Sequence, residues 1–479
     1  MEATADLLDG MPRLIQAGMG IRVSSCTLAN ATSRLGALGV VSSVALRHIV
    51  IEEIREGREE VIAIARTFPI RSYVDAILQF APGGPKHRRP APLDDPDPVR
   101  GDLPKRLSVI AAYVEVMRAK QGHRGKVGIN IMWKCALTVL PSIYGAMIAG
   151  VDALLCGAGV PMELPDIVNA IRTGRDVDYK PLHGTGTNAS LTIAQDNPAA
   201  LFADREPPKV MPILSNFAFP KRILDIWERE FDGARPFAFI LENHEAGGHN
   251  APPRNKVGFG EQDDIDSYFD RVHGLGAPIY VAGAFPSGGT RSDLLYWMER
   301  GAYGIQVGSR FALSDESGMR RDLKDAVLAQ NAHGEEHLVT HARVSPTGYP
   351  FKVRELAGTL SDPTVYAKRK RLCNKGYLLQ AKYEEQVDGS VKETYICPAM
   401  PEKQYRKLGG VEDDLEDRVC LCNTLLATVG LFDQDEPPMV TMGRSGALCT
   451  ERRTARQVVE DILTPQYVAA EEAALTTTA

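Results

Sequence analysis

The stretch Ile240-Leu241-Glu242-Asn243-His244-Glu245-Ala246-Gly247-Gly248-His249-Asn250-Ala251-Pro252-Pro253 gives the clearest indication of how the chain folds. The apolar run that ends in it, residues 236–241, is typical of a short buried strand. Two glycines then allow a sharp backbone turn and the close approach of a flat molecule. His249, beyond the turn, is a proton-transfer group whose ordinary pKa lies near neutral pH. Taken alone, the stretch also fits a plain glycine turn with a histidine in solvent.

Short apolar strands alternate with helical segments along the first two thirds of the chain. The expected strands are residues 14–20, 38–43, 126–132, 151–159, 209–216, 237–241, 278–283 and 303–310, with helices over 24–35, 50–65, 136–149, 163–173 and 294–300 between them. Eight such units predict an α/β fold, a (β/α)8 TIM barrel, whose chemistry lies at the C-terminal ends of the strands. An open doubly wound sheet is the alternative with the same alternation.

Composition excludes several classes of protein. The chain has 479 residues, 44% of them hydrophobic, which suffices for one large domain and an appendage. A formal net charge of −6 argues against a nucleic-acid partner. We find no run of 18 apolar residues and no signal pattern at the start, so we expect no membrane partner and a cytoplasmic location. Eight cysteines in so long a chain do not indicate a disulfide scaffold.

The domain organisation follows from the strand pattern. Residues 1–330 are expected to form the barrel, with excursions near 81–106 and 173–206 where the sequence is polar and irregular. Residues 331–479 form a C-terminal extension that we expect to pack on the barrel. Four of its cysteines, Cys373, Cys397, Cys420 and Cys422, have the ligand chemistry of a zinc site or an iron–sulfur cluster, but their spacing equally fits ordinary thiols. No metal ligand is therefore assigned.

Two glycine turns follow the last two expected strands, at residues 283–289 and 308–310. In barrels this is a frequent phosphate pocket, built from backbone N–H groups. The dinucleotide pattern G-x-G-x-x-G is not linked to a strand here, and the phosphate-loop pattern G-x-x-x-x-G-K-[ST] is absent from the sequence. A mononucleotide cofactor such as FMN fits these turns better.

The chain resembles the nitronate monooxygenase family, formerly called 2-nitropropane dioxygenases, and the related FMN-dependent enoyl-ACP reductases. The matching segments are residues 15–20, 36–41, 128–130, 209–215, 245–249, 281–283 and 304–310, in family order within residues 12–320. The resemblance implies an FMN-binding barrel in which His249 is the family's catalytic histidine. It also implies that Gly283, and Gly308 with Ser309, bind the phosphate.

On this basis the expected cofactor-binding residues are Ala17, Gly18, Met19, Asn130, Ser215, Gly248, Gly283, Ala284, Gln306, Gly308 and Ser309. Each polar member is individually as well explained as an ordinary buried group bonded to backbone. Two positions depart from the family pattern. Gly18 stands where a proline is usual, and Ala284 stands where a second glycine is usual, which preserves a backbone donor if the turn does not need a positive φ.

Three functions stay open at this point. The first is oxidation of alkyl nitronates with dioxygen. The second is enoyl-thioester reduction, which implies NAD(P)H as reductant and an acyl carrier protein as partner, in an enzyme that acts with a fatty-acid or polyketide synthase. The third is a flavin-binding module without turnover. Both catalytic functions use His249, and the oligomeric state, a homo-oligomer included, is left open.

Overall fold

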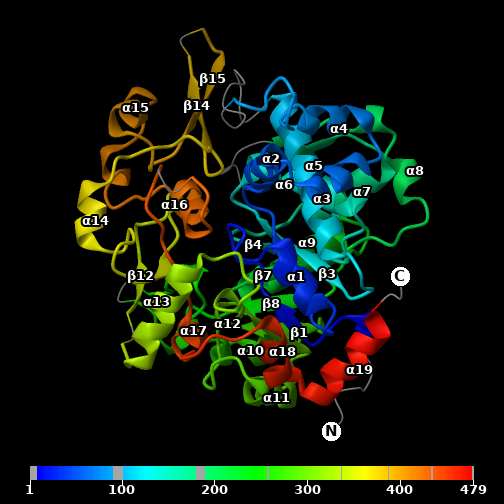
Figure 1. The fold of residues 1–479 in the computed structure, drawn as a ribbon, viewed down its shortest axis with the longest axis vertical. Helices are drawn as coiled ribbons and strands as arrows, with labels where there is room; N and C mark the ends of the chain where they lie inside the picture. Colours follow the sequence, from blue (N-terminus) through cyan, green and yellow to red (C-terminus); the bar gives the residue numbers. More distant parts are fainter. Residues whose placement is uncertain are drawn as a thin grey trace.

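A computed structural model of the chain describes residues 8–89, 101–179, 189–255, 258–335, 337–386, 388–432 and 435–476. Figure 1 shows a broad barrel region, in blue to green, beside an extension in yellow and orange, with the last helices in red returning to the barrel. None of the helices in these ranges combines the length and apolar composition that a membrane span requires.

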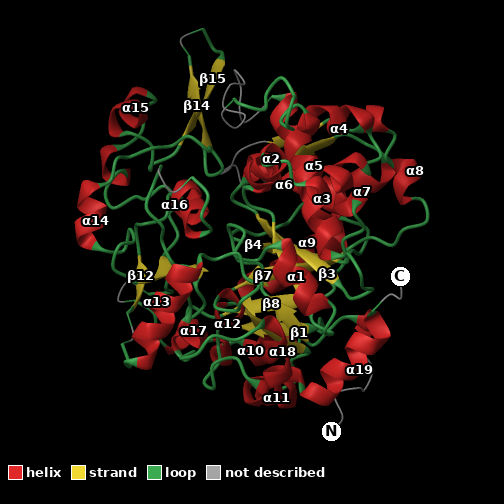
Figure 2. Cartoon of the chain, viewed as in Figure 1, coloured by secondary structure: helices red, strands yellow, loops and turns green. Residues whose placement is uncertain are grey.

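Eight parallel strands form a closed barrel, which confirms the predicted fold class. Leu14 of the first strand lies opposite Ile305 of the last, so the sheet closes on itself and the open-sheet alternative is wrong. Figure 2 shows these strands inside a layer of helices. The barrel strands are β1 (Leu14–Gln16), β2 (Leu38–Ser42), β3 (Val127–Met132), β4 (Ala153–Gly157), β7 (Lys209–Leu214), β8 (Phe239–Glu242), β10 (Ile279–Ala282) and β11 (Gly304–Val307).

Alternate side chains of the strands fill the inside of the barrel. Val40, Leu155 and Ile240 belong to one buried cluster within it, whereas their neighbours Val41 and Leu241 belong to the cluster shared with the helices. Successive strand side chains point to opposite faces of the sheet, and both faces are covered here. This double burial explains why the strands are almost continuously apolar in sequence.

Helices cover the outside of the barrel. Those between strands are α1 (Cys26–Ser33), α2 (Leu46–Arg55), α3 (Glu59–Arg66), α4 (Arg71–Leu78), α5 (Asp102–Ala119), α6 (Ala136–Ile148), α7 (Leu164–Thr173), α8 (Ala199–Phe202), α9 (Ala218–Glu230), α10 (Phe269–His273) and α11 (Arg291–Glu299). After β11 follow α12 (Ser309–Ala312) and α13 (Arg321–Ala332). The helix expected over 50–65 is two helices, α2 and α3, because Gly57 turns the chain with φ +74°.

The two expected excursions contain more regular structure than the sequence indicates. In the first, α5 begins at Asp102, and residues 90–100 lie outside the described ranges. In the second, β5 (Val177–Tyr179) pairs with β6 (Ala189–Leu191), while residues 180–188 lie outside the described ranges. Each of these short strands buries its first and third side chains and exposes the second. That alternation is too short to stand out from a polar sequence.

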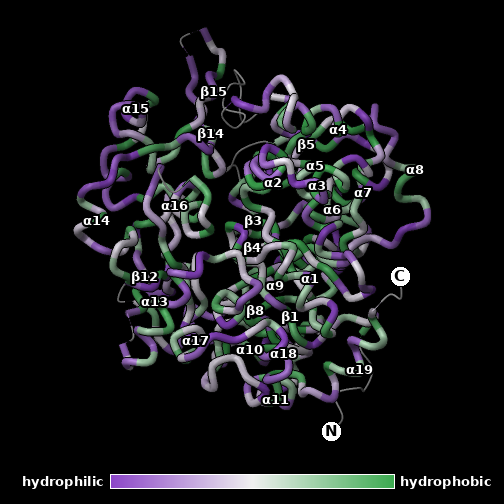
Figure 3. Tube along the Cα trace, in the orientation of Figure 1, coloured by the Kyte–Doolittle hydropathy of each residue, from purple (hydrophilic) through white to green (hydrophobic). Residues whose placement is uncertain are grey.

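The C-terminal extension meets the barrel through a small antiparallel sheet. In it β12 (Leu338–His341) pairs with β13 (Phe351–Arg354), which pairs with β9 (Gly248–His249) of the turn after β8. The other elements of the extension are α14 (Pro363–Lys368), β14 (Gln380–Glu385), β15 (Val391–Ile396), α15 (Glu402–Lys407), α16 (Leu421–Thr428) and α17 (Arg444–Ala447). The hairpin of β14 and β15 projects from one end of the molecule, and its outer part is hydrophilic (Figure 3). The last helices, α18 (Ala455–Leu463) and α19 (Pro465–Leu475), return to the barrel, where α18 packs against α1 and α11.

The five cysteines of the extension, the four named above and Cys449, are free thiols. Cys397, Cys420 and Cys422 are buried, and Cys373 is half-buried. Within the described ranges, no group of three or more His, Cys, Asp or Glu side chains is placed to hold a metal ion. The four thiols nevertheless lie near one another, because Cys373 is within hydrogen-bonding reach of Cys397 and Cys420, and Cys420 is within reach of Cys422. Metal analysis of the purified protein tests the zinc or cluster hypothesis.

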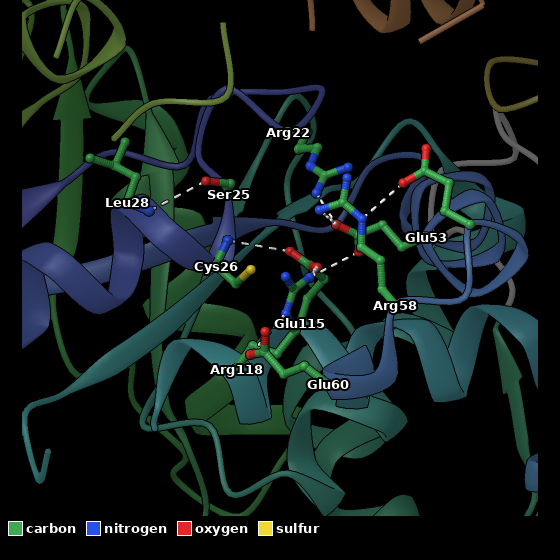
Figure 4. Close-up of polar contacts among 10 residues, drawn as sticks. Arg22, Ser25, Cys26, Leu28, Glu53, Arg58, Glu60, Glu115 and Arg118 are labelled. Carbon is green, nitrogen blue, oxygen red and sulfur yellow. Dashed lines mark hydrogen bonds and ion pairs between the residues drawn. The ribbon is translucent and has the colours of Figure 1, made fainter. Parts of the chain in front are cut away.

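A buried ion network holds the loop that follows β1 against helices α2 and α5. Arg22 of that loop pairs with Glu53, which also accepts from Arg118 at 2.9 Å. Arg118 in turn contacts Glu115 at 3.0 Å, and Glu115 accepts from the backbone N–H of Cys26. Figure 4 shows these side chains converging between the elements. Because residues 17–21 of the same loop line a cavity at the barrel mouth, the network also fixes part of that cavity.

We expect Glu53→Gln to lower the free energy of unfolding by about 3–5 kcal/mol, the usual cost of removing one partner from a buried ion pair. The substitution keeps the shape of the side chain but leaves Arg22 and Arg118 without their shared carboxylate. Denaturant unfolding monitored by circular dichroism measures the change. Glu60→Gln is the control, because that carboxylate is exposed and lies 3.8 Å from Arg118. Equal stability of the two variants would contradict a structural role for the network.

Candidate active site

A cavity of about 220 Å³, here called the inner cavity, lies at the C-terminal mouth of the barrel. Its walls come from the ends of several barrel strands, the loop after β1 and the C-terminal extension. Of the residues expected from the sequence, it gathers Ala17, Gly18, Met19, Asn130, Gly248, His249, Gly283, Gln306, Gly308 and Ser309. These residues are far apart in the sequence, and the parallel arrangement of the strands brings them together.

Two of the expected residues do not line the inner cavity. Ser215 lines a neighbouring cavity instead. Ala284 is half-buried beside the inner cavity, and its carbonyl accepts a hydrogen bond from Trp297 Nε1 at 2.9 Å. The sequence places both correctly at strand ends, but the turn of the chain after each strand directs them elsewhere.

The departures from the family pattern have local explanations. A Cβ atom on Gly18 would lie 2.1 Å from Cβ of Asn130, so the Asn130 side chain occupies the space that a larger residue would need. Gly283 has φ +81°, and a Cβ there would also meet the backbone of Ala246 at 2.9 Å. Ala284 is not among the described residues with positive φ. Its place in the turn therefore needs no glycine.

Two buried polar atoms in the wall of the inner cavity have no hydrogen-bond partner in the described chain. They are Oε1 of Gln306, at the end of β11, and Oγ of Ser42, at the end of β2. Buried polar atoms are normally satisfied, so an orphaned pair facing one cavity indicates a polar ligand. Ser42 was not expected from the sequence. A hydroxyl at the end of an apolar strand was the only signal that pointed to it.

A larger cavity of about 680 Å³, here called the outer cavity, adjoins the inner one. Both cavities share four lining residues: Ala158, Ile213, Glu242 and His249. The remaining wall of the outer cavity is partly aromatic and partly charged, with Trp133, Tyr179, Phe219, Tyr349 and Tyr383 in the first group and Lys134, Glu163 and Arg222 in the second. A ligand in the inner cavity would therefore meet a second ligand at Glu242 and His249.

His249 is held from the side of the C-terminal extension. Its Nε2 lies 2.7 Å from Oγ of Ser345, and its ring contacts Phe351 edge-on at 4.8 Å between centroids. Burial, helped by the positive charge of Lys134, lowers the pKa of His249 to about 4. The sequence-based expectation of a pKa near neutral pH does not allow for this burial, and the imidazole is neutral at pH 7.

Glu242 is the second ionisable group at the junction of the cavities. It is the last residue of β8, and burial raises the pKa of its carboxyl to about 7. Glu242 was not expected from the sequence, although it directly follows the apolar run of β8. A carboxylate at the end of a buried strand is a detectable signal, but its meaning depends on the cavities, which only the fold creates.

His244, in contrast, lies outside both cavities. Its ring stacks on Phe259 with centroids 4.7 Å apart. It lines a separate pocket of about 40 Å³ beside Asp263. It therefore serves as a natural control for His249.

The extension completes the wall of the inner cavity. Leu425, Thr441, Gly443 and Ser445 line it, and the backbone N–H of Gly443 donates to Ser309 Oγ at 2.8 Å. None of the site residues expected from the sequence lies C-terminal to Ser309. The residues of the extension that line the cavity are too ordinary in sequence to indicate such a role.

The chain matches no family model and no curated protein. Among solved structures it is similar to FabK from Thermotoga maritima, with a TM-score of 0.49 and 16% identity over 99% of each chain. A nitroalkane oxidase from Streptomyces ansochromogenes gives 0.45 and 14%, over 97% of each chain. The enoyl reductase domain of MlnA from Bacillus amyloliquefaciens gives 0.45 and 12%, over 96% of this chain and 95% of that one. The nitroalkane oxidase and the enoyl reductase domain are proteins of the kinds that the sequence resemblance implies.

Proposed function

We propose that this protein is an FMN-dependent oxidoreductase that oxidises alkyl nitronates with dioxygen. The observation that carries the proposal is the inner cavity itself, at the C-terminal mouth of the barrel, with the glycine turns after β10 and β11 in its wall and His249 at its edge. Barrels place cofactors and catalytic groups at this end. The turns offer backbone donors to a phosphate, the orphaned polar atoms offer partners to a polar ligand, and the histidine offers a hydrogen bond to a substrate.

The residues of the inner cavity fit a flavin mononucleotide. Gly283, Gly308 and Ser309 offer backbone and hydroxyl groups to a phosphate, and Gly18 and Met19 offer a close, flat contact to a ring. Gln306 and Asn130 are polar partners for the ring or the ribityl chain. When bound, FMN supplies the electron transfer that the protein side chains themselves cannot provide.

The protein's own side chains position the substrate, and His249 exchanges a hydrogen bond with it. His249 is neutral, so it can accept or donate one hydrogen bond to a substrate but does not hold an anion through a full positive charge at pH 7. Ser345 fixes the orientation of its ring. The aromatic side chains in the wall of the outer cavity offer apolar contacts to the substrate.

A second activity, NAD(P)H-dependent enoyl-thioester reduction, is favoured by one observation. The outer cavity, at about 680 Å³, is large enough for an extended acyl chain, and Lys134 and Arg222 offer positive charge to a phosphate-bearing carrier. Oxygen uptake with a nitronate alone supports the oxygenase. Flavin bleaching that requires a pyridine nucleotide supports the reductase, and a yellow protein that bleaches with neither is a flavin-binding module.

We expect denatured protein to release FMN and not FAD, and Gly308→Asp to weaken FMN binding at least tenfold. The added carboxylate would face the phosphate, whereas a Cβ at this position meets only ordinary contacts, the nearest at 3.5 Å from Ala17. Fluorescence titration of the apoprotein with FMN measures the affinity. Gly308→Asn is the matched control, of equal size without charge. If both variants bind FMN as the wild type does, the phosphate lies elsewhere.

We expect His249→Ala to lower turnover by about 10²–10⁴-fold while the protein keeps its flavin, since general acid–base and hydrogen-bonding help is typically of that size. Ser345→Ala leaves the imidazole present but unanchored, so its loss should be smaller. Steady-state oxygen uptake and flavin absorbance give the two readouts. His244→Ala is the control, and we expect little change in turnover. Wild-type turnover in His249→Ala would remove the histidine from the mechanism.

A further inference from the structure

Four cysteines of the C-terminal extension come from three separate segments of the chain. Cys373 lies in the loop between α14 and β14, and Cys397 directly follows β15. Cys420 is the N-cap residue of α16, and Cys422 is the second residue of that helix. The fold therefore gathers thiols from two loops at the N-terminus of one helix.

The four thiols contact one another in a row. Cys373 lies within hydrogen-bonding reach of Cys397 and of Cys420, and Cys420 lies within reach of Cys422. Three of them are buried and the fourth, Cys373, is half-buried. A buried structural cysteine normally behaves as a small apolar side chain among other apolar side chains. Four thiols in mutual contact point instead to a ligand that they share.

The spacing of the row suits a single zinc ion. Within the described ranges no three ligand side chains already surround one point, so the ion would have to draw the thiols from a row into a tetrahedron. Zn–S bonds of about 2.3 Å place two zinc-bound sulfurs roughly 3.8 Å apart, which is close to the separation of sulfurs in hydrogen-bonding contact. The iron and sulfide atoms of an iron–sulfur cluster would hold the cysteines farther apart.

Backbone donors support the sulfur of Cys420. The N–H groups of Cys422 and Asn423, in the first turn of α16, hydrogen-bond to this sulfur. A helix N-terminus favours the thiolate, which is the form of cysteine that binds a metal. Hydrogen bonds to metal-binding groups from such outer neighbours orient the ligands and strengthen the site.

Basic side chains surround the thiols. Arg371 and Arg418 lie within electrostatic range of Cys397, and Lys375 lies within range of Cys420. Arg371 donates to the backbone carbonyl of Leu415 at 3.0 Å, and Arg418 to that of Asp414 at 3.0 Å. Carbonyl groups satisfy the donors but leave the positive charges uncompensated. A zinc ion with four thiolates carries a net negative charge, which these side chains would balance.

We propose that Cys373, Cys397, Cys420 and Cys422 bind one structural zinc ion in tetrahedral coordination. Each thiol releases its proton to water as its sulfur binds the ion, and no electron is transferred. Four protein ligands leave no open position for a substrate, so the ion stabilises the extension and takes no part in the reaction.

The zinc site lies on the segment that supports the candidate active site. Arg418, two residues before Cys420, donates to the backbone carbonyl of Ser345. Ser345 in turn holds Nε2 of His249 at 2.7 Å. Leu425 of α16 lines the inner cavity. A metal ion at the start of α16 would therefore fix both the helix that lines the cavity and the loop that holds the histidine.

The test is the metal content of the full-length protein. Protein from cells grown with added zinc is purified with a thiol reductant and analysed by inductively coupled plasma mass spectrometry, and we expect one zinc ion per chain. Cys373→Ser and Cys420→Ser each remove a ligand from the middle of the row, so the zinc content should fall at least about tenfold. Cys449→Ser is the matched control. That thiol belongs to the same extension but contacts the carbonyl of Ser445 at 3.7 Å, and the variant should keep its zinc.

A second measurement covers the case in which the cysteine variants do not fold. Wild-type protein from cells grown with cobalt in place of zinc should show the visible absorption of tetrahedral, thiolate-bound Co²⁺. Circular dichroism shows which variants are folded. Neither measurement depends on flavin or on turnover, so a failure of the proposed oxidoreductase function would not alter the result.

Three outcomes would contradict the zinc site. The first is wild-type protein that contains no stoichiometric zinc and gives no thiolate absorption with Co²⁺. The second is iron with inorganic sulfide in place of zinc, which would assign the thiols to a cluster. The third is a full equivalent of zinc in folded Cys373→Ser or Cys420→Ser, which would place the ion elsewhere in the chain.

Discussion

Closure of the barrel between β1 and β11 is the constraint on which the site depends. The register that sets Leu14 against Ile305 continues to Gln16 against Val307, so the loop after β1 and the turn after β11 leave the sheet side by side. Gly308 consequently lies against Met19, and a Cβ atom added to the glycine would be only 3.6 Å from the methionine sulfur. In an open sheet these two segments would be at opposite edges, and no inner cavity would form between them.

The second constraint is the close contact of two glycine backbones. A Cβ on Gly247 would lie 2.6 Å from the backbone of Met442, and one on Gly443 would lie 2.6 Å from the carbonyl oxygen of Glu245. Only glycine permits this approach, which places the extension directly on the turn that carries His249. The extension thus acts on the site from two sides, through the backbone at Gly443 and through Ser345 and Phe351 around the imidazole.

The sequence was sufficient to predict the eight strands and ten of the residues that line the inner cavity, because both depend on local patterns along the chain. A buried strand appears as an apolar run, and a turn at its end appears as glycine followed by polar residues, as at Gly283 and Gly308. The contributions of Thr441, Gly443 and Ser345 could not be predicted, since they arise from long-range packing of the extension. The same limit applies to Ser215. The sequence predicts its position at the end of β7, but it does not predict which of the two neighbouring cavities the residue lines.

Burial acts in opposite directions on the two ionisable groups where the cavities meet. Removing water disfavours the charged form of each, so the pKa of His249 falls while that of Glu242 rises. The histidine is thereby kept neutral and the carboxyl is brought close to neutral pH, which reverses the roles that their ordinary pKa values would suggest. Residue type alone makes the histidine the natural proton carrier of this stretch. The barrel and the extension together shift the pKa of both side chains, because the burial of both is a property of the closed structure and not of the segment that carries them.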